Sequence, residues 1–152
     1  YVEQPCKSYE ECLAVRKHTD HPMILDECMD SLAMLIRGYN DSAMDLVNLK
    51  INRIGGITKA RQFRDLCVSL GITNTIEDAW GGEIATAAIA HLAHSTPPGF
   101  HFQSSAFHEY TDLVIADGGP EMADGYMWVT DAPGLGVTPK LDALGDPVSE
   151  HN

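Results

Sequence analysis

The chain has 152 residues, 44% of them hydrophobic, which is enough for one domain with a substantial core. Ten basic and 22 acidic residues give it a formal net charge of −12 at pH 7. Such a surface repels phosphate backbones and anionic lipids, so we expect no nucleic-acid partner and no membrane partner. No apolar stretch approaches the roughly 20 residues that cross a bilayer.

The four cysteines, at positions 6, 12, 28 and 67, form no CxxC pair. We interpret them as reduced, packed thiols of a cytoplasmic protein, and disulfides are the alternative. The sequence opens at Tyr1 without a methionine or a signal peptide, so we expect that it is cut at its front.

Short apolar runs alternate with amphipathic stretches along most of the chain. Strands are predicted over residues 2–5, 23–25, 46–51, 72–76 and 100–103. Helices are predicted over 8–17, in a short stretch after Ser31, and over 58–70 and 83–94. Ser8 and Glu11 have the spacing of a capping box, and Gly71 is placed to end the third helix. The strand centres recur every 22 to 27 residues, which is the length of a βα unit.

Five parallel strands fit either an open doubly wound sheet or part of a TIM barrel, and the period alone does not choose between them. Glu3, Asp26 and Lys50 fall at the carboxyl ends of successive strands, where TIM barrels place their chemistry. From Asp117 onward the chain is rich in Gly and Pro, with one predicted strand over 126–130 and a turn over 131–136.

The spacing of these three residues suggests a joint role. Glu3 and Asp26 are 23 residues apart, and Asp26 and Lys50 are 24 apart, about one βα unit each. A hard cation such as Mg²⁺ prefers carboxylate oxygens, and a lysine near it can move a proton. The cation would stabilise the enediolate formed when a proton leaves the carbon beside a carboxylate. Three unrelated, solvated strand ends are the alternative interpretation.

Four segments resemble signatures of the enolase superfamily, muconate-lactonizing (mandelate racemase-like) subgroup, in the order and spacing of that family. They are VEQP at 2–5, LDE at 25–27, NLKINRIGGIT at 48–58 and DAPGLGV at 131–137. A further segment, residues 77–96, is most similar to the cis-3-hydroxy-L-proline dehydratases and the hydroxyproline betaine epimerases of that subgroup. The resemblance covers essentially the whole chain.

The resemblance implies roles for individual residues. Glu3 and Asp26 would bind Mg²⁺ (or Mn²⁺), and Lys50, with Gly55 and Gly56 after it, would be the acid/base of the sixth barrel strand. The fold class would be α/β, the C-terminal portion of a modified enolase-type (β/α) TIM barrel. Residues 1–116 would form the partial barrel, and residues 117–152 a tail that packs on the N-terminal cap domain.

The family's cap domain, its first three strands, its third metal ligand and its Lys-x-Lys pair have no counterpart in this sequence. A barrel usually needs about 250 residues. We therefore expect this chain alone to be inactive, and a full-length protein to be an enzyme that assembles as a homo-oligomer.

Smaller roles are predicted for five other residues. Trp80 could hold a cationic ring nitrogen through a cation–π contact, or could pack on the barrel rim. Asp78 could pair with that nitrogen or cap the next helix. Glu27 could fix a metal ligand or Lys50. Gln103 and Ser104 could donate hydrogen bonds to the substrate, or could be solvated loop residues.

The predicted function is Mg²⁺-dependent abstraction of the proton alpha to a carboxylate. We expect a small amino-acid or carboxylate substrate and the dehydration of cis-3-hydroxy-L-proline to pyrroline-2-carboxylate. One alternative is 2-epimerisation or racemisation of hydroxyproline or proline betaine, which the sequence does not separate from dehydration. Another, of a different class, is a non-catalytic truncated barrel fragment.

Overall fold

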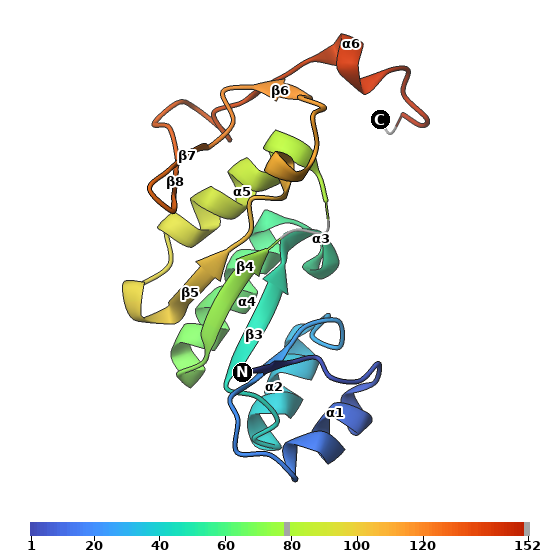
Figure 1. The fold of residues 1–152 in the computed structure, drawn as a ribbon, viewed down its shortest axis with the longest axis vertical. Helices are drawn as coiled ribbons and strands as arrows, with labels where there is room; N and C mark the ends of the chain where they lie inside the picture. The colour runs from blue at the N-terminus through green and yellow to red at the C-terminus, as the bar shows by residue number, and fades with distance from the viewer. Residues whose placement is uncertain (78–79, 151–152) are drawn as a thin grey trace.

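The computed structural model describes residues 1–77 and 80–150. Five parallel strands form one sheet in the order β1-β2-β3-β4-β5, each beside its neighbour in the sequence (Figure 1). These strands are β1 (Val2–Glu3), β2 (Met23–Leu25), β3 (Leu46–Lys50), β4 (Thr73–Glu77) and β5 (His101–Ser104).

Helices connect the strands, as parallel pairing requires. They are α1 (Tyr9–Arg16), α2 (Leu32–Asn40), α3 (Ile51–Ile54), α4 (Ile57–Leu70) and α5 (Gly82–His94), and a 3₁₀ turn, η1 (Pro98–Phe100), precedes β5. The predicted capping box is present, because Ser8 accepts a hydrogen bond from the Glu11 amide and the Glu11 carboxylate accepts one from the Ser8 amide. Gly71 ends α4 with φ 76°, a conformation that favours glycine.

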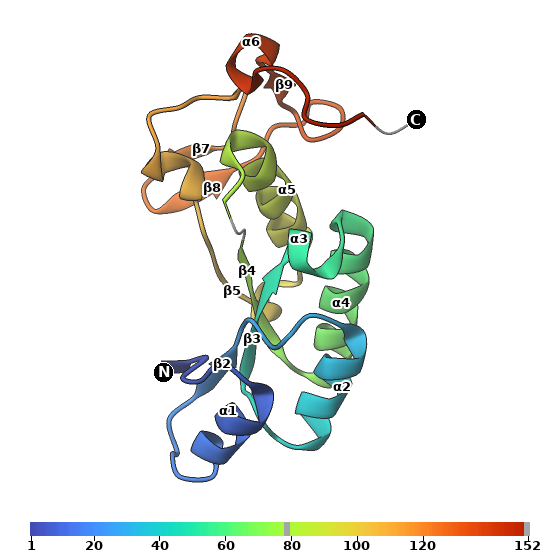
Figure 2. The ribbon, with the colours of Figure 1, turned by 90° about the vertical axis from the view of Figure 1, so that its right-hand side faces the viewer.

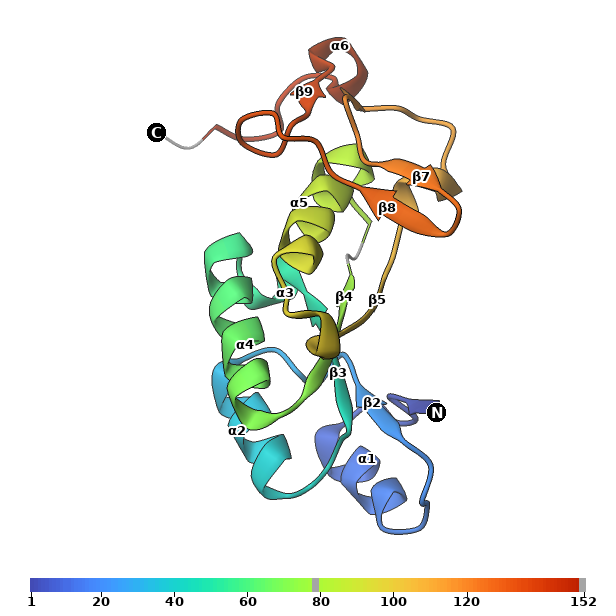
Figure 3. The same ribbon diagram turned by 90° about the vertical axis from the view of Figure 1, so that its left-hand side faces the viewer.

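The helices pack on one face of the sheet (Figures 2 and 3). The buried core contains residues from α1, α2, α4, α5 and the strands, among them Cys12, Leu35, Phe63, Ile89 and Leu49. A doubly wound sheet carries helices on both faces, whereas a barrel carries them only outside. This arrangement therefore favours the predicted barrel portion over an open doubly wound sheet.

Strand alternation separates two sets of side chains. Met23, Leu25, Val47, Leu49 and Ile76 belong to the core beneath the helices. The residues that alternate with them point to the opposite face, since side-chain direction reverses at every strand residue. That opposite face is polar toward the carboxyl ends of the strands, and it carries the residues of the candidate site.

The strand and helix boundaries lie within two residues of those predicted, except that the short helix expected after Ser31 extends to Asn40. Two other features differ. The fifth strand begins at His101, because Phe100 lies in the 3₁₀ turn η1. Residues 51–54 form a separate helical turn, α3, which Gly55 and Gly56 divide from α4 with φ values of 91° and 108°. The two glycines therefore connect α3 to α4, and β3 leads directly into α3.

The tail contains more structure than the single strand predicted. A second 3₁₀ turn, η2 (Phe107–Tyr110), precedes the tail, and the strand β6 (Ala116–Asp117) leads into it. The tail then contains β7 (Glu121–Ala123), β8 (Tyr126–Trp128), β9 (Thr138–Pro139) and a helical turn, α6 (Leu141–Leu144). β6 pairs with β9, and β7 pairs with β8, in antiparallel fashion. Asp124 and Gly125, both with positive φ, connect β7 to β8, as in a two-residue hairpin turn.

All four cysteines are free thiols. Within residues 1–77 and 80–150, the helices are too short and too polar to span a membrane.

Candidate active site

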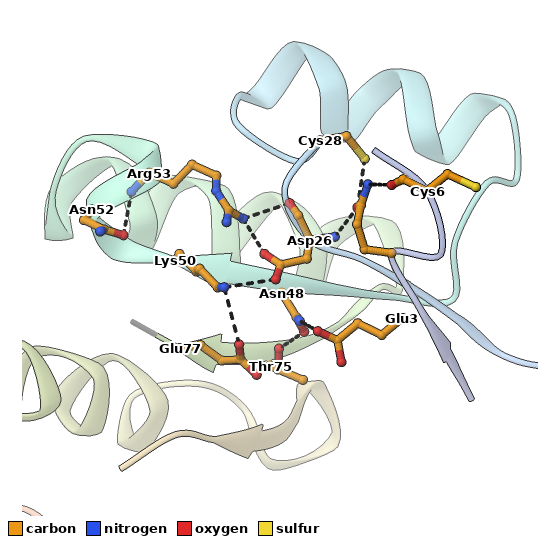
Figure 4. Close-up of polar contacts among 11 residues, drawn as sticks. Glu3, Cys6, Asp26, Cys28, Asn48, Lys50, Asn52, Arg53, Thr75 and Glu77 are labelled. Carbon is orange, nitrogen blue, oxygen red and sulfur yellow. Dashed lines mark hydrogen bonds and ion pairs between the residues drawn. The ribbon is translucent and has the colours of Figure 1, made fainter. Parts of the chain in front are cut away.

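Polar side chains form two rows across the open face of the sheet (Figure 4). The first row contains Asp26, Lys50 and Glu77. The second contains Glu3, Asn48 and Thr75. Strand register aligns the rows, because Lys50 pairs with Glu77 and Asn48 pairs with Thr75 across β3 and β4.

The row of Asp26, Lys50 and Glu77 is charged and largely buried. Lys50 Nζ lies 3.0 Å from Asp26 Oδ2 and 4.0 Å from Glu77 Oε2, and the Lys50 side chain is 14% exposed. Arg53, from α3, donates to Asp26 Oδ1 and, at 2.8 Å, to the Asp26 carbonyl oxygen. The Asp26 carboxylate therefore contacts two cations while being only 5% exposed. Such burial is tolerated because the charge is paired.

The row of Glu3, Asn48 and Thr75 is held by hydrogen bonds. Asn48 Nδ2 donates to Glu3 Oε1 at 2.9 Å, and Thr75 Oγ1 donates to Asn48 Oδ1. Asn48 and Thr75 are buried, whereas Glu3 is exposed. The Glu3 carboxylate is thus accessible to a ligand and is held from the protein side.

Gln4 connects the segment that carries Glu3 to Asp26. Its Oε1 accepts from the Asp26 amide at 2.8 Å and from the Cys28 thiol at 3.3 Å, and its Nε2 donates to the Cys6 carbonyl at 2.9 Å. Burial raises the pKa of Cys28 to about 11, although the hydrogen bond with Gln4 lowers it. Cys28 is therefore a neutral S–H donor at pH 7.

The structure places Glu3, Asp26 and Lys50 at the same edge and face of the sheet. The Asp26 carboxylate faces Lys50 and Arg53, and the Glu3 carboxylate faces Asn48 (Figure 4).

The residues with smaller predicted roles lie in different settings. Glu27 is exposed, and the ion pairs of Lys50 are with Asp26 and Glu77. Asp78 lies outside the described residues. Gln103 is exposed and stands opposite Thr75 in register, while Ser104 Oγ lies 2.9 Å from His101 Nε2.

Trp80 follows β4 with φ 72° and is 64% exposed. Its indole stacks on Phe107, with ring centroids 5.1 Å apart, and lies 6.1 Å from the Tyr110 ring. Two aromatic rings therefore hold the indole at the end of the strand.

Sequence reasoning did not assign roles to Glu77, Arg53, Asn48 or Thr75. Glu77 lies 27 residues after Lys50, so the strand-end spacing that selected Lys50 could also have selected it. Arg53 could have been found because it lies three residues after Lys50, about one helical turn away in the segment that follows the strand. Asn48 and Thr75 become evident only through strand register, because the Asn48 side chain reaches a partner 45 residues away.

The donor types at this edge fit a hard divalent cation. Glu3 and Asp26 offer carboxylate oxygens, which Mg²⁺ prefers. The described residues do not gather three His, Cys, Asp or Glu side chains into one metal-binding group. A cation held by Glu3 and Asp26 would therefore take its remaining oxygen ligands from water, substrate or other parts of a longer chain.

Comparison with known proteins identifies the family of this chain. A family model described as "Enolase C-terminal domain-like" matches residues 1–143. The chain belongs to this enolase family. The cis-3-hydroxy-L-proline dehydratase of Roseibium aggregatum is 51% identical over 152 residues, which cover all of this chain and 41% of that protein.

Two crystal structures from Roseovarius nubinhibens ISM are closely similar in fold. A mandelate racemase/muconate lactonizing enzyme superposes with a TM-score of 0.94 at 45% identity, over 97% of this chain and 40% of that one. A member of the enolase superfamily complexed with magnesium superposes with a TM-score of 0.91 at 38% identity, over 97% and 40% of the two chains.

These comparisons confirm the resemblance seen in the sequence and the fold class. The sheet and its helices are a C-terminal portion of the enolase-type barrel, related to mandelate racemase and muconate lactonizing enzymes. The chain spans about 40% of the length of the relatives that it matches.

Proposed function

We propose that a full-length protein containing these residues removes the proton alpha to the carboxylate of cis-3-hydroxy-L-proline and eliminates water, giving pyrroline-2-carboxylate. The observation that carries this proposal is the pairing of Lys50 with Asp26 at the carboxyl edge of the sheet. The 51% identity to a cis-3-hydroxy-L-proline dehydratase supports this substrate.

Each residue of the site has a part in this proposal. Lys50 is the acid/base, because its ammonium group lies at the carboxyl edge of the sheet and is oriented by the carboxylates of Asp26 and Glu77. Glu3 and Asp26 are the ligands of Mg²⁺ or Mn²⁺, which when bound supplies positive charge beside the substrate carboxylate. Arg53 contacts Oδ1 of Asp26, while Lys50 contacts Oδ2.

Charge balance supports a cation at this edge. Glu3, Asp26 and Glu77 carry three negative charges, and Lys50 and Arg53 carry two positive ones. A divalent cation reverses the resulting excess of one negative charge and makes the site attractive to an anionic carboxylate.

The test is α-proton exchange, followed by NMR in D₂O with Mg²⁺ and cis-3-hydroxy-L-proline. Lys50→Met in the full-length protein should lower the exchange rate by about 10²–10⁴-fold or more, the usual effect of losing a positioned acid/base. Lys17→Met is the matched control, because Lys17 is exposed beyond α1 and should leave the rate unchanged. Parental exchange in Lys50→Met would contradict the role of Lys50.

The same experiment separates the alternatives. Loss of water identifies a dehydratase. Inversion at the alpha carbon without loss of water identifies a hydroxyproline or proline betaine epimerase. Absence of exchange from the full-length protein would leave the non-catalytic alternative.

We further propose that residues 117–152 pack on the N-terminal cap domain of the full-length protein. Tyr126, Trp128 and Leu141 in this tail are 68%, 60% and 76% exposed. The exposed Tyr126 and Trp128 rings, with centroids 6.4 Å apart, are typical of a surface that another part of a protein covers.

A further inference from the structure

We propose that Asn48 and Thr75 are positioning residues, which hold the Glu3 carboxylate in the orientation that a divalent cation requires. The inference rests on the proposed function, in which Glu3 is a metal ligand. In this inference, Thr75 on β4 and Asn48 on β3 support Glu3 on β1, and the hydrogen bonds reach across β2, which lies between β3 and β1.

The direction of each hydrogen bond is fixed by chemistry. The Glu3 carboxylate only accepts, so the amide group of Asn48 must turn its Nδ2 toward Glu3. Asn48 Oδ1 then faces Thr75, whose hydroxyl donates to it. With the amide turned over, Oδ1 would face the carboxylate and two acceptors would meet. The Glu3 carboxylate therefore sets which way the Asn48 amide turns, and the Thr75 hydroxyl holds the Asn48 side chain in that place.

Burial makes the two supports rigid while Glu3 stays accessible. Asn48 is 1% exposed and Thr75 is 0% exposed, whereas Glu3 is exposed. Ile24 is the register partner of Glu3 on β2 and offers no polar group from its side chain. The Asn48 hydrogen bond is therefore the side-chain contact that orients the Glu3 carboxylate within residues 1–77 and 80–150.

Packing alone does not account for a polar pair at this place. A buried amide and a buried hydroxyl are tolerated only when they are hydrogen-bonded, and apolar residues of similar size would fill the same space without that requirement. The pair ends on a carboxylate at the functional edge of the sheet. Hydrogen-bond partners of metal ligands orient those ligands, and replacing such partners typically weakens metal affinity about 10–100-fold.

At Thr75, two substitutions separate the effect of losing the hydroxyl group from the effect of changing the side-chain volume. Thr75→Val keeps the shape and removes the hydroxyl, whereas Thr75→Ser keeps the hydroxyl and removes a methyl group. Thr73→Val is the matched control, since Thr73 lies on the same strand and the same face, two residues before Thr75. The measurement is the Kd for Mg²⁺ by titration calorimetry on the full-length protein without substrate, with the melting temperature recorded in parallel.

We expect Thr75→Val to weaken Mg²⁺ binding about tenfold or more. Thr75→Ser and Thr73→Val should bind Mg²⁺ as the parental protein does, even where Thr75→Ser melts at a lower temperature. A parental Kd in Thr75→Val would overturn the inference. Equal weakening in the Val and Ser variants would also overturn it, because the effect would then follow packing rather than the hydroxyl.

A Glu3→Gln variant distinguishes this failure from failure of the proposed function. If Glu3→Gln and the parental protein bind Mg²⁺ equally, Glu3 is not a ligand. Both the proposed metal site and the positioning role of Asn48 and Thr75 are then refuted. If Glu3→Gln loses binding while Thr75→Val retains it, the metal site stands and only the positioning role is refuted.

Discussion

Asp26→Asn should destabilise the protein strongly, although it replaces a carboxylate by an amide of almost equal size. The substitution removes the negative charge that Lys50 and Arg53 share. All three side chains are at least four-fifths buried, with exposures of 5%, 14% and 20%. Lys50 keeps Glu77 at 4.0 Å, but Arg53 loses its carboxylate partner.

The magnitude follows from two opposing effects. Two unit charges 3.0 Å apart, as in Lys50 and Asp26, attract by about 5–6 kcal/mol at an effective dielectric constant of about 20. Asparagine avoids the cost of desolvating a carboxylate, which amounts to several kcal/mol. With two cations left facing a neutral amide, we expect a net loss of about 2–4 kcal/mol. In a full-length protein of the relatives' size, about 370 residues, the melting temperature should then fall by about 3–5 °C.

Thermal unfolding of the full-length protein, followed by circular dichroism without metal, measures this effect. Glu10→Gln is the matched control, because it makes the same chemical change in an exposed pair with Arg37 and should leave the melting temperature unchanged. A double-mutant cycle with Arg53→Met isolates the Asp26–Arg53 coupling. An unchanged melting temperature in Asp26→Asn would refute the reasoning, since the ion pairs would then only offset desolvation.

Three further outcomes are expected. Burial lowers the pKa of His101, although a backbone hydrogen bond with Gln103 raises it, so the unfolded chain binds the proton more readily than the folded one. Urea unfolding should therefore show the free energy of unfolding falling as the pH drops below about 6.5, and His101→Gln should flatten this pH dependence. Burial raises the pKa of Cys67 to about 12, so iodoacetamide at pH 7.5 should modify Cys67 only after denaturation, as mass spectrometry would reveal, and rapid native modification would contradict its packing. The 152-residue chain alone should not dehydrate cis-3-hydroxy-L-proline and should self-associate through the open edge at β1, which centrifugation would detect; a monomer with full turnover would contradict this.

The succession of strands and helices and the strand-end places of Glu3, Asp26 and Lys50 could be predicted because both depend on local spacing, whereas the barrel rests on the strand-end residues and on the family resemblance. One βα unit occupies 22 to 27 residues, and parallel strands bring every unit's carboxyl end to one edge. A strand-end residue such as Lys50 is therefore located by counting. Glu77 obeys the same spacing, but the strand predicted over 72–76 ends one residue before it, whereas the observed strand ends at Glu77.

The rest of the site depends on register, which spacing does not determine. Asn48 reads in the sequence as one polar residue within a buried strand, and Thr75 reads as an ordinary β-branched strand residue. Their connection to Glu3 requires that β3 and β4 pair in one alignment, since a shift of β4 by one residue would turn Thr75 toward the helices and away from Asn48. The hairpin of β7 and β8 is a different case, because Asp124 and Gly125 are a turn signal present in the sequence. The second strand of that hairpin was expected and the first was not, since Glu121–Ala123 is exposed throughout and lacks the apolar pattern that identifies a strand. Residues whose role is defined by a distant partner are thus the ones that counting along the chain does not reach, and in this site they are the residues proposed to support the metal.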